Sequence, residues 1–326
     1  MSIPQSHRAI YAAAVLFGAA SAAQAQAPYP NQQIRIVCPF PAGGGTDLTS
    51  RLLGGEMQRI LGQPVVVDNR TGASGMIGTE VVAKAKPDGY TLLVASGEMS
   101  LNPHLYPKMA YDWDRELQPI TLLVKVANVM AVHADVPAKN VAELIAHAKK
   151  NPGKLTFSSS GVGNPQQLTG ELFNKMAGVK ILHVPYKGAA PQLAALAGGE
   201  VTLTYVSIGA AKPFIDSGRI RPIGVTSTTR VGALPDVPAI AEYPPLAGFE
   251  LVNYFGFFGP AGLPDPILKR LNATAVQIMK MPDLTAKFRS LGFEPSPGAP
   301  EEFRQFIRNE SAKFAKIIAE AGIKLE

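Results

Sequence analysis

Short apolar runs alternate along the chain with segments whose apolar residues repeat at spacings of three and four. The first run, residues 34–38, leads into a loop rich in proline and glycine. The helical segment that follows carries its apolar residues on one face, at Leu48, Leu52, Leu53, Met57, Ile60 and Leu61. Strands that alternate with helices in this way predict an α/β fold with right-handed crossovers and parallel sheets.

The alternation forms two blocks and therefore predicts two lobes. We expect strands at 34–38, 65–67, 90–95, 129–132, 155–158, 181–184, 201–206, 223–226 and 251–258, and three final helices at about 266–281, 284–291 and 300–321. The chain crosses between lobes near Val124 and returns near residues 245–250. We expect residues 26–124 and 248–326 in lobe 1 and residues 125–247 in lobe 2. Each lobe should be a mostly parallel sheet flanked by helices, with a ligand in the cleft between them.

The loop at residues 39–47, Pro-Phe-Pro-Ala-Gly-Gly-Gly-Thr-Asp, joins a strand to a helix. Its glycines permit positive φ and can turn backbone amides toward an anion at the helix N-terminus. A plain packing turn is an equal alternative on this evidence. The loop is neither G-x-G-x-x-G nor a P-loop, which disfavours nucleotides and leaves small anions such as carboxylates.

A second loop of the same kind follows the strand at 155–158. It contains Ser160, Gly161, Gly163, Asn164 and Pro165, and proline is well placed for the first turn of the next helix. Loops at 71–75 and 96–99 are expected on the same sheet edge as the first loop. Two anion sites, one in each lobe, could hold two ends of one ligand.

Composition excludes several classes of protein. With 17% charged and 46% hydrophobic residues among 326, the chain is globular, and its net charge of +6 includes no Lys/Arg-rich block of the kind that binds nucleic acid. Cys38 is the single cysteine, so no intrachain disulfide can form, and its apolar strand predicts a buried thiol.

The N-terminus has the features of an export signal. His7 and Arg8 precede an apolar stretch at 10–20, and Ala23 and Ala25 fit the small-residue rule for cleavage before Gln26. We expect residues 1–25 to be removed and the mature protein to be exported and free in its compartment, without insertion into the membrane.

An exported serine hydrolase is the rival hypothesis from a different class. Serines at 158–160 lie near His183, but no G-x-S-x-G elbow is present and His183 falls on an apolar strand. The other histidines beyond the signal, His104, His133 and His147, lack metal-ligand spacing. We therefore expect no enzyme activity, no metal and no cofactor.

Several ordered motifs occur along the chain beside the loop at residues 39–47: Gly62-Gln63-Pro64-Val65-Val66-Val67, Pro87-Asp88-Gly89-Tyr90-Thr91-Leu92, Asn102-Pro103, Val184-Pro185-Tyr186-Lys187-Gly188 and Leu234-Pro235-Asp236-Val237-Pro238. By these motifs the chain resembles, over essentially its whole mature length, the Bug or TctC-type periplasmic receptors of tripartite tricarboxylate transporters. The resemblance implies a monomeric two-lobed receptor that closes on a small carboxylic acid and delivers it to membrane transporter subunits. A sensor co-receptor for the same ligands is the alternative that the sequence leaves open.

The resemblance also implies which residues bind ligand. They are Gly44, Gly45, Thr46 and Asp47 in the first loop, Ser158, Ser160, Gly163 and Asn164 in the second, together with Ser96, Ser207, Phe40 and Tyr205. Asp47 either contacts the acid or caps the loop, and Phe40 and Tyr205 either contact it or pack in the core.

Three positions depart from the family pattern. Val206-Ser207 stands where many members have Asp-Asn, Asn164 where many have serine or threonine, and Gln167 where many have histidine. The missing acid at 206 argues against an amino acid ligand, whose ammonium group would need that partner. Dicarboxylates or aromatic acids are therefore favoured.

Overall fold

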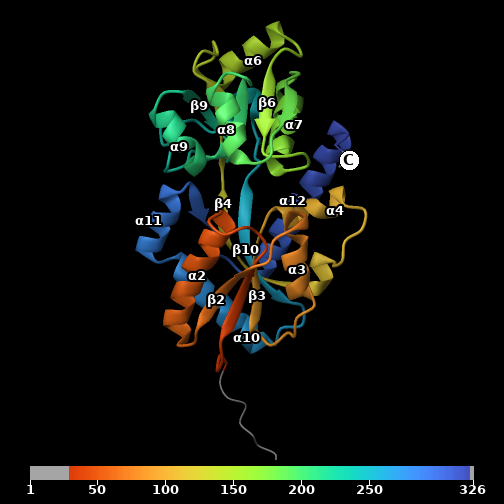
Figure 1. Cartoon of the computed structure of the whole chain (residues 1–326), viewed down its shortest axis with the longest axis vertical. Helices are drawn as coiled ribbons and strands as arrows, with labels where there is room; N and C mark the ends of the chain where they lie inside the picture. The colour runs from red at the N-terminus through yellow and green to blue at the C-terminus, as the bar shows by residue number, and fades with distance from the viewer. Residues whose placement is uncertain (1–28, 324–326) are drawn as a thin grey trace, which may run out of the picture.

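The computed structural model describes residues 29–323, which form two lobes stacked along the long axis, each built on its own sheet (Figure 1). The signal peptide expected at residues 1–25 lies outside the described residues. The expected two-lobed α/β fold is confirmed. No helix within residues 29–323 combines the length and apolar character that a membrane span requires.

The sheet of lobe 1 has six strands in the order β11-β4-β10-β3-β1-β2. They are β1 (Ile34–Cys38), β2 (Val65–Asn69), β3 (Thr91–Ser96), β4 (Leu117–Val126), β10 (Asn253–Pro260) and β11 (Phe293–Pro295). The accompanying helices are α2 (Gly45–Leu61), η1 (Ala73–Gly75), α3 (Met76–Ala83), α4 (Glu98–Leu105), α5 (Trp113–Glu116), α10 (Asp265–Met279), α11 (Pro282–Ser290) and α12 (Pro300–Ala321).

The sheet of lobe 2 has five strands in the order β7-β6-β8-β5-β9. They are β5 (Asn128–His133), β6 (Thr156–Ser159), β7 (Leu182–Pro185), β8 (Leu203–Ser207) and β9 (Ile220–Val225). Its helices are α6 (Val141–Lys150), α7 (Pro165–Ala177), α8 (Ala189–Ala197), α9 (Ile208–Asp216), η2 (Ile240–Glu242) and η3 (Pro244–Leu246).

Both sheets are mixed, which corrects the expectation of mostly parallel sheets. β1 runs parallel to β2 and β3, and β6 runs parallel to β7 and β8, but β10 is antiparallel to β3 and β4, and β5 is antiparallel to β8 and β9. β5 and β10 are the strands by which the chain enters each sheet from the other lobe. A parallel pair of consecutive strands needs a crossover connection, usually a helix, within one lobe. β5 and β10 each follow a segment of the other lobe instead, so no such connection makes them parallel to their neighbours.

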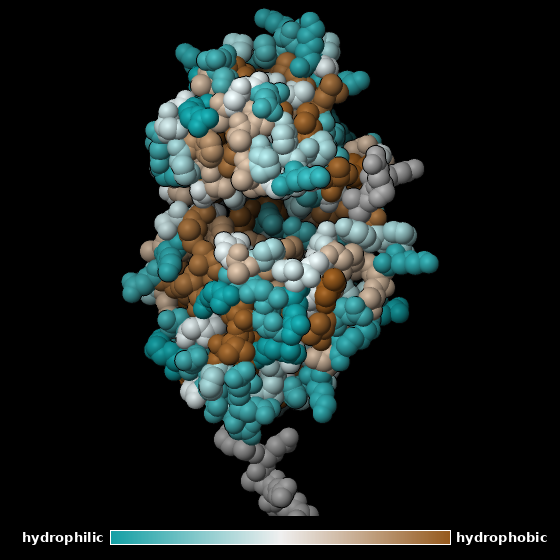
Figure 2. All heavy atoms as spheres, viewed as in Figure 1, coloured by the Kyte–Doolittle hydropathy of each residue, from teal (hydrophilic) through white to brown (hydrophobic). Residues whose placement is uncertain are grey.

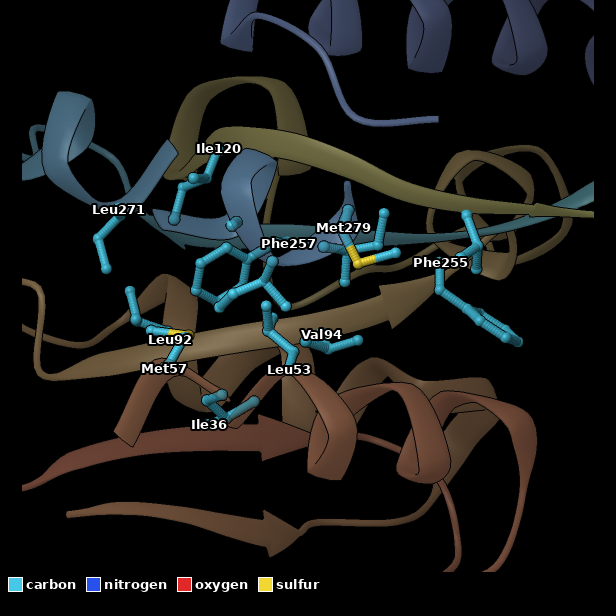
Figure 3. Packing of buried hydrophobic residues seen from close by; sticks show 14 of the residues in the cluster. Ile36, Leu53, Met57, Leu92, Val94, Ile120, Phe255, Phe257, Leu271 and Met279 are labelled. Carbon is cyan, nitrogen blue, oxygen red and sulfur yellow. The ribbon is translucent and has the colours of Figure 1, made fainter. Parts of the chain in front are cut away.

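The apolar face of α2 packs on the sheet of lobe 1. Figure 3 shows Leu53 and Met57 of α2 beside Ile36 of β1, Val94 of β3 and Phe257 of β10, and all five are fully buried. Burial of each such side chain contributes roughly 1.5 to 3 kcal/mol. This packing fixes the N-terminus of α2 at the end of β1, facing lobe 2.

The last helix, α12, connects the two lobes. Its C-terminal part places Phe314 and Ile318 in an apolar cluster with Leu168 of α7, and Lys175 of α7 forms an ion pair with Glu320 of α12. Figure 1 shows this end of α12 beside α7 and α4. The two lobes are therefore joined both by the chain segments that cross between them and by α12.

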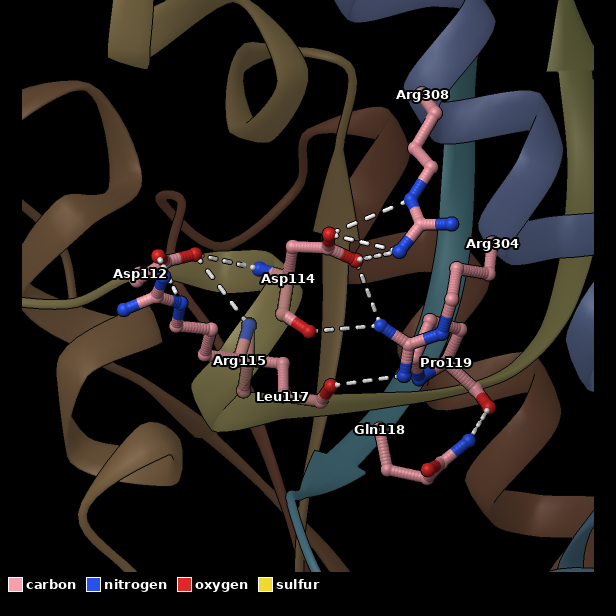
Figure 4. A network of polar contacts seen from close by, with 8 residues as sticks. All are labelled: Asp112, Asp114, Arg115, Leu117, Gln118, Pro119, Arg304 and Arg308. Carbon is pink, nitrogen blue, oxygen red and sulfur yellow. Dashed lines mark hydrogen bonds and ion pairs between the residues drawn. The ribbon is translucent and has the colours of Figure 1, made fainter.

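A charged cluster anchors the other end of α12 to lobe 1 (Figure 4). Arg304 donates to Asp114 Oδ1 at 2.8 Å, and Arg308 donates to Asp114 Oδ2 at 2.9 Å. Burial disfavours the charged form of Asp114, but the hydrogen bonds from both arginines outweigh it and lower the pKa of this carboxyl.

Candidate functional site

A cavity of about 260 Å³ lies between the lobes, where Figure 2 shows the molecule hollowed. Both lobes contribute to its wall, which consists of Gly45, Glu98, Val126, Asn128, Ser160, Asn164, Pro165, Gln166, Ser207, Asn253, Phe255 and Phe293. Among these residues Glu98 is the only ionisable one. The volume is below the roughly 300 to 1,000 Å³ typical of drug-sized ligand sites, so the cavity suits a small molecule.

Four helices begin at the cavity wall. Gly45 is the first residue of α2, Glu98 is the first of α4, Pro165 is the first of α7, and Ser207 precedes α9. A helix N-terminus carries the positive end of the helix dipole. In α7 the first residue is a proline without an amide proton, and the Gln167 amide is capped by Asn164, so this helix contributes its dipole and not unpaired amides. The positive potential here therefore comes from backbone groups and not from basic side chains, which is an arrangement that binds anions.

Asp47 acts as the cap of the first loop. Its Oδ2 accepts from the Gly43 amide at 2.9 Å and from Arg51 Nε at 3.0 Å, and its Oδ1 accepts from Asn69 Nδ2 at 2.9 Å. Burial disfavours ionisation of Asp47, but these three hydrogen bonds outweigh it and lower the pKa of the carboxyl. Both oxygens are engaged, so the structure has Asp47 stabilising the loop.

The glycines of the first loop have different roles. Gly43 adopts the left-handed conformation at φ +86°, whereas Gly44 is extended at φ −76°. Gly45 is required for another reason, because a Cβ atom there would lie 2.9 Å from Phe255 Cζ and 3.1 Å from Phe293 Cζ. The absence of a side chain lets the start of α2 lie against this aromatic pair.

The first turn of α2 has amides available for a ligand. The structure gives the amides of Gly45, Thr46 and Asp47 no hydrogen-bond acceptor within residues 29–323, and Gly45 lines the cavity. Thr46 is buried and is not among the wall residues, so Gly45 is the residue by which this turn reaches the cavity.

The second loop differs from the expected anion nest. Its amides bond to the loop's own side chains: Ser160 N donates to Gln166 Oε1 at 2.8 Å, and Gly163 N donates to Gln167 Oε1 at 2.7 Å. The prediction of a backbone nest at these two residues is wrong for this conformation. The physical reason is that the two glutamines in the first turn of α7 are long enough to fold back over the loop.

Side chains of the second loop reach the cavity instead. Ser160 and Asn164 both line it, and Asn164 Nδ2 donates to Ser160 Oγ at 2.9 Å. Asn164 also caps α7 by accepting from the Gln167 amide at 2.9 Å. The Ser160 hydroxyl keeps its own proton for a ligand, because it serves as the acceptor in this pair.

Eight of the twelve predicted residues are not among the wall residues. Gly44, Thr46, Asp47 and Gly163 belong to the two loops described above, and the other four lie elsewhere. Ser158 is fully buried and donates to Thr204 Oγ1 at 2.9 Å, and Tyr205 is buried in the core of lobe 2. Phe40 lies against Gly75, where a Cβ atom would be 3.1 Å from its ring. Ser96 is buried and donates its hydroxyl to Glu98. Tyr205 therefore packs in the core, whereas Phe40 is half-buried.

Several wall residues were not singled out from the sequence. Glu98, Asn128 and Asn253 supply polar groups, while Phe255 and Phe293 form an aromatic pair with ring centroids 5.5 Å apart. Asn253 Oδ1 also accepts from the Gly97 amide at 3.0 Å. Asn128 and Asn253 stand where the chain passes between lobes, and that position is the signal that could have identified them.

Ser159 and His183 form the pair that a serine hydrolase would need. Ser159 Oγ lies 2.6 Å from His183 Nε2, but it also donates to Gly161 O at 2.7 Å. Because the Ser159 hydroxyl donates its single proton to Gly161 O, it can only accept a hydrogen bond from the His183 imidazole. In a serine hydrolase the direction is the opposite, since the imidazole accepts the proton of the serine hydroxyl. Ser159 is fully buried, and burial lowers the pKa of His183 to about 4.

Position 206 does not face the cavity. Val206 is fully buried in an apolar cluster of lobe 2. The absence of an acid there therefore says nothing about the charge of the cavity, and the sequence argument against amino acid ligands loses its basis. Within residues 29–323 no group of three or more His, Cys, Asp or Glu is placed to hold a metal ion.

Known proteins similar to this chain agree on one family. Residues 49–323 match the model of the family described as tripartite tricarboxylate transporter family receptor. A protein of Pseudomonas sp. (strain P51), "UPF0065 protein in tcbD-tcbE intergenic region", is 37% identical over 292 residues, which cover 90% of this chain and 87% of that protein.

Two solved structures of Rhodopseudomonas palustris proteins are also similar. "R. palustris Rpa4515 with adipate" has a TM-score of 0.79 and 36% identity, covering 91% of this chain and 99% of that one. "MatC (Rpa3494) from Rhodopseudomonas palustris with bound malate" has a TM-score of 0.73 and 30% identity, covering 89% of this chain and 100% of that one.

Proposed function

The chain belongs to the tripartite tricarboxylate transporter receptor family, and from that premise we propose that it captures a small carboxylic acid between its lobes, with di- or aromatic carboxylates favoured. Members of this family are solute-binding receptors and not enzymes. In our proposal the mature protein is a periplasmic monomer. It delivers its ligand to the membrane subunits of a tripartite transporter after the signal at residues 1–25 is removed.

The observation that carries this proposal is the convergence of four helix N-termini on one interlobe cavity. A carboxylate at the first turn of α2 would be within reach of the free amides there. Hydrogen bonds to a charged group contribute roughly 1.5 to 3 kcal/mol each, so three would give on the order of 4 to 9 kcal/mol before ordering costs. Micromolar affinity needs about 8 kcal/mol.

We propose that the opposite end of the ligand meets side chains. Lobe 2 brings five polar side chains to the wall: Asn128, Ser160, Asn164, Gln166 and Ser207. The aromatic pair of Phe255 and Phe293 offers an apolar surface to a methylene chain or a ring between two carboxylates. The adipate and malate complexes of two relatives support a dicarboxylate.

A thermal-shift screen of mono-, di- and tricarboxylates, aliphatic and aromatic, tests this proposal. A ligand at about a thousand times its Kd adds roughly 4 kcal/mol of stability, which raises the melting temperature by several degrees. We expect at least one dicarboxylate or aromatic acid to do so, with matched amines and alcohols that lack the carboxylate as controls. No shift with any acid would contradict the proposal.

A further inference from the structure

The one ionisable side chain on the cavity wall is acidic, although the site receives an anion. Glu98 lines the cavity and is the first residue of α4. Within residues 29–323, Ser96 is the one residue whose side chain forms a hydrogen bond with the Glu98 carboxyl group. Among the residues that the structure describes, no lysine, arginine or histidine lines the cavity. A plain dicarboxylate would therefore bring a second negative charge toward Glu98 with no cation between them.

A ligand group that donates a hydrogen bond resolves this conflict. A carboxyl group accepts hydrogen bonds in its charged form and, through its carbonyl oxygen, in its neutral form. Burial raises the pKa of Glu98, and the hydrogen bond from Ser96 offsets this in part. Either form would accept from a hydroxyl or an ammonium group, and for the charged form the contact would replace repulsion by attraction.

The backbone next to Glu98 is held in place by hydrogen bonds. The Gly97 amide is bonded to Asn253 Oδ1 at 3.0 Å, and Ser100 Oγ donates to Gly97 O at 2.9 Å, so the start of α4 is tied to lobe 1. The amides of α2 that await a carboxylate line the same cavity through Gly45. One small acid can thus meet the α2 amides with its carboxylate and Glu98 with a donor.

We propose that Glu98 is a specificity-determining residue that accepts a hydrogen bond from a hydroxyl or ammonium group of the bound acid. This inference rests on the proposed function and narrows its ligand class to acids that carry such a donor. A hydrogen bond to a carboxyl group in a cavity favours the donor-bearing acid by about ten- to a hundredfold.

Isothermal titration with succinate, malate and aspartate tests the proposal, because the three acids share a four-carbon dicarboxylate skeleton and differ in one donor. We expect malate or aspartate to bind at least about tenfold more tightly than succinate. A preference for malate identifies the donor as a hydroxyl, and a preference for aspartate identifies it as an ammonium group.

Two variants assign the preference to Glu98. In Glu98→Leu, which cannot accept a hydrogen bond, the preference should fall below about threefold. In the isosteric Glu98→Gln, a hydroxyl preference should persist and an ammonium preference should shrink, which keeps the test valid if the leucine variant does not fold. Equal binding of the three acids by the wild type, or an unchanged preference in Glu98→Leu, would overturn the inference. Binding of none of the carboxylates in the screen would instead contradict the proposed function.

Discussion

Gly45 lies against Phe255 so closely that a Cβ atom on Gly45 would stand 2.9 Å from Phe255 Cζ. The start of α2 is therefore set by contact between a backbone and an aromatic ring of a strand that returns from the other lobe. Gly45→Ala should push these groups apart, destabilise the fold by about 1 to 3 kcal/mol, and weaken acid binding by tenfold or more. Titration calorimetry and urea unfolding measure both effects.

Gly55, on the same helix, is the matched control for this substitution. It is exposed, and a Cβ atom there would meet nothing within 4 Å. Gly55→Ala should raise stability by about 0.5 to 1 kcal/mol and leave affinity unchanged, because alanine is the better helix former. If both variants bound the acid like the wild type, the role of Gly45 would be refuted.

Asp47→Asn tests whether the first loop depends on its cap. The change removes the charge that holds Arg51 and weakens the bond to the Gly43 amide, so we expect a loss of about 1 to 3 kcal/mol and weaker acid binding. Because the folded pKa of Asp47 is lowered, its contribution is present above the ordinary pKa of about 3.9 and is lost as pH falls through the folded value.

Glu56→Gln provides the comparison for Asp47, since Glu56 lies on the same helix and pairs with the exposed Arg59. Such a surface pair contributes little, so stability should change by less than about 1 kcal/mol. Urea unfolding at pH 7 and at pH 3 should show the difference between wild type and Asp47→Asn shrinking at the lower pH. An equal difference at both pH values would contradict the capping role.

Asp114→Asn should loosen α12 from lobe 1. Two arginines, Arg304 and Arg308, lose their shared carboxylate, and after allowance for solvent screening we expect a cost of about 1 to 2 kcal/mol. Asp265→Asn, which breaks a highly exposed pair with Lys269, is the control and should cost less than about 0.5 kcal/mol. Indistinguishable melting curves for the two variants would show that the anchor is not significant.

His183 should make stability depend on pH in a known direction. Its folded pKa is about 4, whereas an unfolded histidine titrates near 6.5. The unfolded chain therefore binds a proton first, so wild-type stability should fall as pH drops from about 6.5 to 4. His183→Gln should lack this part of the decline. Parallel stability curves for the two proteins between these pH values would contradict the assignment.

Local signals in the sequence account for the elements that were predicted well. The apolar spacing of α2, the glycines before it and Pro165 at the first turn of α7 act within a few residues, so they can be recognised without knowledge of the tertiary fold. The strand at 251–258 and the crossing between lobes also follow from such patterns. These elements brought Gly45, Ser160, Asn164 and Ser207 to one cavity.

The rest of the cavity wall depends on tertiary structure. Phe293 comes from the short strand β11, and Asn253 and Phe255 come from a strand that enters lobe 1 after the whole of lobe 2. The fold-back of Gln166 and Gln167 depends on side-chain conformation, which no spacing rule predicts. Local patterns therefore identify where a site begins, whereas long-range packing determines what completes it.

A crystal structure of the protein with malate tests the central claim most directly. The account predicts electron density for the acid between the lobes, with one carboxylate within hydrogen-bonding distance of the Gly45 and Thr46 amides at the start of α2. An acid bound outside this cavity, or a carboxylate held without contact to those amides, would contradict it.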